Sequence, residues 1–368
     1  MEQDRKIRVA ITQGDTNGVG YEQILKTFSS PEMMELCTPI VYGSPKIATY
    51  HRKALNMEGG SFSIISSAEE AKDGRLNLLA CFDDEVKVDL GVPTAESADA
   101  GFRALASALA DAKKGLFDVL VTTPLLPPPL GRAGVGSPSS QQSFIEKELG
   151  TKAQSVVINS CQRMAFVTKA MALKEVVAAI SKERVIEQAT AFHHTIRRDL
   201  RVLNPRIAVL ALNPVADGKE EQEIILPAIA EMEQNGTRVF GPYAAEQFFG
   251  NRLYDVFDGI LAMYHDQGMA PLKALAADEC IRLLSGLSLV VTAVDDNPFF
   301  EQAGKGIADE SPLRQAVFMA IDVWRNRQTY DEPLANPLPK LYHEKRDESE
   351  KVRFSIPKKH ENSIKERL

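Results

Sequence analysis

The stretch "TAESADAGFRALASALADAKKGLFDVLVTTP", residues 94–124, joins an alanine-rich segment to a short apolar run. Apolar residues recur at helical spacing over 94–115, which predicts an amphipathic α-helix. The run over 117–124 is rich in β-branched residues and predicts a buried strand. A helix that leads directly into a buried strand is the repeating unit of a parallel α/β sheet.

The same alternation continues on both sides of this stretch. Apolar runs predict strands over 7–12, 38–43, 62–67, 75–82, 155–160, 163–168, 206–214, 237–243, 257–263 and 287–294. Longer amphipathic patterns predict helices over 20–37, 44–57, 172–200, 218–236 and 312–328. Strands that alternate with helices at this spacing indicate an α/β fold with mostly parallel sheets.

The length of 368 residues allows two domains, each with its own core. A run rich in proline and glycine, 124–140, interrupts the alternation and is typical of a domain crossing or a site loop. We expect a first, discontinuous α/β domain formed by 1–130 and 270–330, and a second formed by 131–269. Residues 331–368 form a charge-dense tail with few apolar residues.

Composition excludes several classes of partner. Hydrophobic residues make up 44% and charged residues 25%, which is ordinary for a globular protein, and the net charge of −7 argues against nucleic acid or an anionic membrane. No two of the four cysteines form a CxxC pair. Cysteines this far apart are typical of reduced thiols in a cytoplasmic protein. We see no signal peptide and no apolar run of membrane-spanning length, so we expect a cytoplasmic protein.

The segment "YHDQGMAPLK", residues 264–273, carries the most chemistry. His265, Asp266 and Lys273 follow the predicted strand 257–263, where we expect a loop to begin. Asp266 can orient the imidazole of His265, and the ammonium of Lys273 can hold a phosphate or move a proton. We therefore predict His265, Asp266 and Lys273 as catalytic residues; the alternative is that His265 only packs or caps.

Two glycine-rich segments are weaker signals. "ITQGDTNGVGYE" (11–22) follows a strand and opens a helix, and "AGKGIA" (303–308) precedes the last helix. Glycines at such places let a backbone approach a ligand closely, but each segment can equally be a plain tight turn. The segment 11–22 does not have the GxGxxG spacing of a dinucleotide fingerprint.

Taken in order, these segments resemble the 4-hydroxythreonine-4-phosphate dehydrogenase family of vitamin B6 biosynthesis, within the isocitrate and isopropylmalate dehydrogenase-like group. The matching pieces are "ITQGDTNGVGYE", "VLVTTP", "VLALNP", "FGPYAAEQFF", "AMYHDQGMAPLK", "SGL" and "AGKGIA", which lie between residues 7 and 328. The resemblance implies two α/β/α domains around an interdomain cleft, and a homodimer. It implies oxidation of a phosphorylated hydroxy-amino acid with NAD, followed by loss of CO2.

The resemblance also implies a divalent metal, Zn or Mg, held by three histidines. His265 matches one of them, whereas Lys169 and Val215 stand at the other two positions. On this alignment His265 is the one metal ligand that remains, and we expect that the ion is not bound in the family's usual way.

The other family positions are also changed. The resemblance implies substrate contacts at Gln141, Gln142, Lys169 and Arg282, and cofactor contacts at Asp295, Gly304 and Gly306. Gln141 and Gln142 replace a His-Thr pair, and an arginine of the family falls at Val291. These replacements affect the positions that handle ligands, while the glycines and the apolar framework match.

Three interpretations follow. The chain is an NAD-dependent dehydrogenase of the family's type, with impaired or altered activity; or it is a non-catalytic paralogue that serves as a small-ligand-binding or regulatory dimer; or the same cleft binds a different anion. All three predict a small anionic or phosphorylated ligand. They differ in whether NADH is formed and whether a metal is needed.

Overall fold

The computed structural model describes residues 5–57, 61–82, 86–127, 139–276, 279–294 and 297–337. Met1–Tyr330 form one compact unit and Asp331–Leu368 a second. No helix within the described ranges combines the length and the apolar character needed to cross a bilayer.

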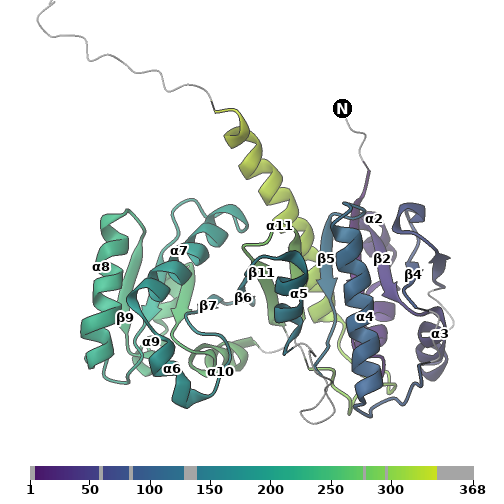
Figure 1. Ribbon diagram of the computed structural model, residues 1–368, viewed down its shortest axis with the longest axis horizontal. Coiled ribbons are helices and arrows are strands. Elements are labelled where there is room, and N and C mark those ends of the chain that lie inside the picture. The colour runs from purple at the N-terminus through teal and green to yellow at the C-terminus, as the bar shows by residue number, and fades with distance from the viewer. Residues whose placement is uncertain are drawn as a thin grey trace, which may run out of the picture. The chain divides into compact units, whose positions relative to one another are not determined.

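The described strands form one twelve-stranded sheet (Figure 1). Its strands are β1 (Ile7–Thr12), β2 (Cys37–Gly43), β3 (Ser63–Ile65), β4 (Asn77–Ala80), β5 (Val119–Thr122), β6 (Gln154–Ile158), β7 (Arg163–Phe166), β8 (Ile207–Leu210), β9 (Val239–Tyr243), β10 (Gly259–Ala262), β11 (Ile281–Ser285) and β12 (Val290–Ala293). Their order is β3-β4-β2-β1-β5-β12-β11-β6-β7-β10-β8-β9.

Helices connect and cover these strands. They are α1 (Gly20–Thr27), α2 (Pro31–Leu36), α3 (Pro45–Ala54), α4 (Ala95–Ala112), α5 (Gln141–Leu149), α6 (Leu173–Ala179), α7 (Lys182–Arg198), α8 (Leu226–Gln234), α9 (Ala245–Gly250), α10 (His265–Ala276) and α11 (Ser311–Ala335). A π-helical turn, Glu221–Ile225, leads into α8, and short 3-10 turns lie at Ala68–Glu70 and Leu253–Val256.

Helix α4 shows why the local sequence folds as it does. Thr94 caps it, because the Thr94 hydroxyl accepts a hydrogen bond from the Ser97 amide (3.0 Å) and the Ser97 hydroxyl accepts one from the Thr94 amide (3.3 Å). Its small apolar face is buried, with Ala100, Ala104 and Leu105 excluded from solvent. The predicted helix over 94–115 and the strand after it are confirmed.

The predicted mostly parallel α/β sheet is confirmed. Among the described strands, eight neighbouring pairs are parallel, and the antiparallel pairs are β11 with β12, β11 with β6, and β6 with β7. Strands of both expected domains take part in this one sheet, with β11 and β6 at the junction. The division into two domains stays a prediction.

Helix α10 corrects one expectation. We expected a loop after the strand 257–263, but the chain enters a helix at His265 and stays helical to Ala276. The Gln267 side chain accepts a hydrogen bond from the Met263 amide (2.7 Å), which fixes the first turn. Gly268 packs closely against the sheet, because a Cβ there would collide with Met164 and Phe166. It lets the helix lie directly on the sheet.

The glycine-rich turn after β1 is tightly packed. A Cβ on Gly14 would overlap Thr123, one on Gly18 would overlap Pro298, and Gly14 has a left-handed φ of 72°. In these places the glycines make room for other parts of the chain. The interpretation of 11–22 as a plain tight turn therefore accounts for them.

The same turn buries a carboxyl group, that of Asp15. It is 3% exposed, accepts a hydrogen bond from the Asn17 amide (2.9 Å), and burial raises its pKa to about 6. Because the folded-state pKa lies above the unfolded value, Asp15 favours the folded state most at acid pH, and this contribution is lost as pH rises through about 6.

We therefore expect Asp15→Asn to become relatively more stable as pH rises. The neutral amide can still accept the Asn17 bond but has no buried charge to desolvate. The free energy of unfolding of the variant relative to the native chain should rise by about 1–2 kcal/mol between pH 5 and pH 8. Urea unfolding at both pH values measures it, and a pH-independent difference would contradict it.

Candidate functional site

The carboxyl ends of three neighbouring strands form the edge where the site lies. β10 pairs in parallel with β7 on one side and with β8 on the other, so the three strands end at the same edge. Lys169 follows β7, His265 follows β10, and Val215 follows β8. Ligands of open α/β sheets bind outside this kind of edge.

His265 is the first residue of α10. Its Nδ1 lies 2.8 Å from Oδ1 of Asp266, and its ring stacks on Phe166 with 5.8 Å between centroids. The His265 side chain is 44% exposed. Because Nδ1 is engaged by the carboxylate, Nε2 is the ring nitrogen that can act on a ligand.

A cavity of about 410 Å³ opens beside His265. Its polar lining is His265, Asp266, Lys273 and Arg282, and its apolar lining is Val157, Met269, Ala270, Cys280, Ile281 and Val294. A cavity of this size suits a small metabolite. Two of the four polar groups, those of Lys273 and Arg282, are basic, so the lining favours an anionic ligand.

The structure thus brings together four of the predicted residues, His265, Asp266, Lys273 and Arg282. Arg282 reaches the cavity from β11, a strand that we did not predict because "IRLLS" lacks a clear polar and apolar alternation. Cys280 and Met269 were also missed; nothing in the local sequence marks either as a cavity residue.

Lys169 is bound in an ion pair rather than buried. Its Nζ lies 2.8 Å and 3.1 Å from the two carboxylate oxygens of Glu146 on α5, and its side chain is 57% exposed. Glu146 also accepts hydrogen bonds from the Gln142 side chain and the Ala153 amide, both at 3.0 Å. Partial burial pushes the pKa of Glu146 up, but these hydrogen bonds together hold it below its ordinary value.

The two predicted glutamines serve the chain itself. Gln141 is buried and donates to the carbonyl oxygens of Thr123 and Leu125, both at 3.2 Å. Gln142 donates to Glu146 and to the Ala153 carbonyl (2.9 Å). Both amides therefore fix the start of α5, and neither lines the cavity.

The third strand end carries no ligand group at the predicted position. Val215 is 82% exposed, in the loop after β8. Glu221 closes this loop, because its carboxylate accepts from the Asn213 amide (2.8 Å), the Asn213 side chain (2.8 Å) and the Gly218 amide (2.9 Å). These hydrogen bonds hold the pKa of Glu221 below its ordinary value although burial raises it.

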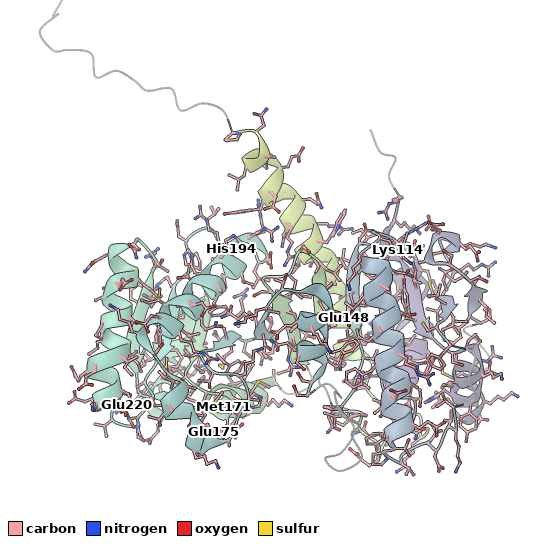
Figure 2. All side chains as sticks on the ribbon, viewed as in Figure 1. Lys114, Glu148, Met171, Glu175, His194 and Glu220 are labelled. Atoms are coloured by element: carbon pink, nitrogen blue, oxygen red, sulfur yellow. The ribbon has the colours of Figure 1, made fainter. Side chains whose placement is uncertain are left out.

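A three-histidine metal centre does not fit these positions. His265 offers an imidazole, Lys169 offers an ammonium that has no lone pair, and Val215 offers only a hydrocarbon side chain. Within the described ranges no group of three His, Cys, Asp or Glu side chains is arranged to hold an ion. Figure 2 shows Met171, two residues after Lys169, and Glu220, five after Val215, both toward the lower edge of the view.

Two of the predicted cofactor residues, Gly304 and Gly306, are not among the residues that line the cavity. Gly304 and Gly306 both have left-handed φ angles, and a Cβ on Gly306 would meet no atom within 4 Å. This loop is tied to α1, since Lys26 donates to the Gly306 carbonyl (2.9 Å) and Glu22 accepts from the Ala308 amide (2.8 Å). The open side of Gly306 leaves room for a ligand; Asp295 lies outside the described residues.

Comparisons with known proteins identify the relatives of this chain. The family model of the pyridoxal phosphate biosynthetic protein PdxA matches residues 35–320. A 4-hydroxythreonine-4-phosphate dehydrogenase from Bacteroides thetaiotaomicron is 47% identical over 359 residues, 96% of this chain and 98% of the relative. One from Geobacter metallireducens is 32% identical over 330 residues, 87% of this chain and 96% of the relative.

A solved structure shows the same similarity. The crystal structure of a 4-hydroxythreonine-4-phosphate dehydrogenase from Burkholderia phymatum is 25% identical, with a TM-score of 0.69. The match covers 87% of this chain and 99% of that one.

Proposed function

The chain belongs to the family of the pyridoxal phosphate biosynthetic protein PdxA, and from this membership we propose that it is an NAD-dependent dehydrogenase of 4-hydroxythreonine 4-phosphate or a closely similar phosphorylated hydroxy acid. The observation that carries the proposal is the cavity beside β10, which joins the histidine–carboxylate pair to Lys273 and Arg282. The names of the relatives supply the substrate class, and the cationic lining supports it.

The proposed reaction removes a hydride and a proton from one alcohol. NAD, when bound, would supply the acceptor for the hydride of the hydroxyl-bearing carbon. The O–H bond breaks and its proton passes to Nε2 of His265. Asp266, at Nδ1, stabilises the imidazolium that forms. The products are a ketone, NADH and a proton.

The two cations have separate roles in this proposal. The ammonium of Lys273 faces the oxygen of the reacting alcohol, where negative charge develops as the proton leaves. The guanidinium of Arg282 binds the phosphate, because its planar fork matches two phosphate oxygens. Val157, Met269 and Ile281 surround the ligand with apolar surface.

The cavity lining also supports the interdomain cleft. Val157 on β6 belongs to the expected second domain and Arg282 on β11 to the first, while α10, which carries His265 and Lys273, spans the expected boundary. We propose a cytoplasmic homodimer in which the ligand binds between 131–269 and the discontinuous first domain. The NAD site is proposed at the open side of Gly306 and at Asp295.

A second candidate, a non-catalytic paralogue that binds a small anion, is favoured by two observations. Lys169 forms an ion pair with Glu146, and Val215 is exposed to solvent. Neither of these two positions of the family's metal site therefore carries a side chain that can bind a metal. Such a protein keeps the cavity and its cations but forms no NADH.

NADH formation separates the two candidates. With NAD and 4-hydroxythreonine 4-phosphate we expect steady NADH formation, and none with the dephosphorylated compound, because Arg282 then has no phosphate to bind. The absorbance of NADH measures the rate. Binding of the phosphorylated compound, seen by calorimetry, without any NADH would reject the dehydrogenase and support the second candidate.

A further inference from the structure

We infer that the reaction centre of this chain is independent of divalent metal, and that the Lys169–Glu146 ion pair stands at the strand edge in place of a metal ligand. The inference rests on the proposed function for the location of the centre. It concerns which groups of this chain carry the positive charge there.

The three positions meet at one edge because the backbone ties their segments together. After β7, the Val167 amide donates to the Ala262 carbonyl (2.8 Å), and the Thr168 hydroxyl donates to the Met263 carbonyl (3.0 Å). The segments after β7 and β10 therefore run side by side up to Lys169 and His265.

The segment after β8 joins the same edge. The Gln267 side chain, in the first turn of α10, donates to the carbonyl of Ala211, directly after β8. Val215 lies in the loop that this segment begins. A metal ligand at each of the three positions would therefore project from three neighbouring strand ends.

The ammonium of Lys169 opposes a metal ion at this edge. It cannot ligate, and its charge repels a divalent cation. Both carboxylate oxygens of Glu146 contact Nζ of Lys169. Because Gln142 and Ala153 fix this carboxylate, the pair is anchored in α5 and Glu146 is not available as a replacement ligand.

The loop after β8 offers no substitute either. The Glu221 carboxylate is buried and is used by Asn213 and Gly218. The neighbouring Glu220 accepts a hydrogen bond from the Asn213 side chain (3.0 Å). Asp217, the carboxylate nearest to Val215 in sequence, accepts a hydrogen bond from the Gln222 side chain (2.7 Å). All three of these carboxylates therefore bind groups of the loop itself or of the helical turn that follows it.

The positive charge for an anionic ligand is instead supplied by side chains of the cavity. Lys273 on α10 and Arg282 on β11 both line it. An ammonium and a guanidinium can bind a phosphate and stabilise a developing oxyanion. Ligand binding should then be indifferent to chelators.

Metal stoichiometry tests the inference directly. The purified native chain, dialysed after exposure to ZnCl2, should retain far less than one zinc per chain by mass spectrometry of the metal. The double variant Lys169→His/Val215→His, which keeps His265, should bind about one Co²⁺ per chain with the visible absorption of a four-coordinate site. The matched control is the same double variant with His265→Ala, which should lose this absorption.

Two results would overturn the inference. One zinc per native chain that survives dialysis would show that other groups complete a metal site. Absence of Co²⁺ binding by the folded double variant would show that the three strand ends do not share one centre. Neither measurement uses turnover, so failure of the proposed dehydrogenase activity would appear separately, as absence of NADH.

Discussion

Replacing Lys273 by methionine is expected to lower kcat/KM for the phosphorylated hydroxy acid by about 10²–10³-fold. Methionine keeps the length and apolar stem of lysine but removes the ammonium that we place against the reacting oxygen. Because this charge interaction grows as the proton leaves, most of the loss should appear in kcat. Steady-state NADH formation at several substrate concentrations measures the split.

The matched control is Lys152→Met, which removes an exposed lysine that does not line the cavity. It should leave both kinetic constants unchanged. If Lys273→Met raised KM alone, Lys273 would be a ground-state binding residue, and the proposed role at the reacting oxygen would be wrong. Equal losses in both variants would indicate a general effect of charge.

Replacing Arg327 by leucine is expected to lower the free energy of unfolding by about 3–5 kcal/mol. Arg327 on α11 is 6% exposed and pairs with Asp199, 3% exposed, at the end of α7. Its Nε and one terminal nitrogen contact the two oxygens of Asp199 (2.9 and 2.8 Å), and its other terminal nitrogen donates to the Leu287 carbonyl (2.9 Å). Leucine would leave the Asp199 charge buried without this partner.

Chemical denaturation of the native chain and of Arg327→Leu measures the loss. Arg325→Leu is the control, because Arg325 lies two residues away on the same helix and is exposed. That variant should change stability by less than about 0.5 kcal/mol. If Arg327→Leu lowered the free energy of unfolding by less than about 1 kcal/mol, water or a local rearrangement would be compensating the buried charge of Asp199.

The sequence predicted the fold well where the local signal was strong. The amphipathic pattern of 94–115 and the apolar runs at 7–12 and 38–43 became α4, β1 and β2. The pattern failed at β11 because that strand is mostly buried and so lacks alternation. It failed at α10 because Gly268 and Pro271 are helix breakers in isolation, whereas here contact with β7 decides the conformation.

The candidate site was predictable in part. His265, Asp266 and Lys273 lie within nine residues of one another, so one segment was enough to propose them. Glu146 could not be predicted as the partner of Lys169, because the pair joins a helix to a strand end 23 residues away. Gln141 and Gln142 carry amides that suit a ligand equally well, and only the fold shows that they bind backbone carbonyls.

The most direct test of a metal-independent dehydrogenase is NADH formation by chelator-treated protein. The native chain, dialysed against EDTA, would be assayed with NAD and 4-hydroxythreonine 4-phosphate in the presence of EDTA, and again after addition of Zn²⁺ or Mg²⁺. We expect the same rate in every sample, because Lys273 and Arg282 supply the charge. A rate that vanishes with EDTA and returns with metal would contradict this.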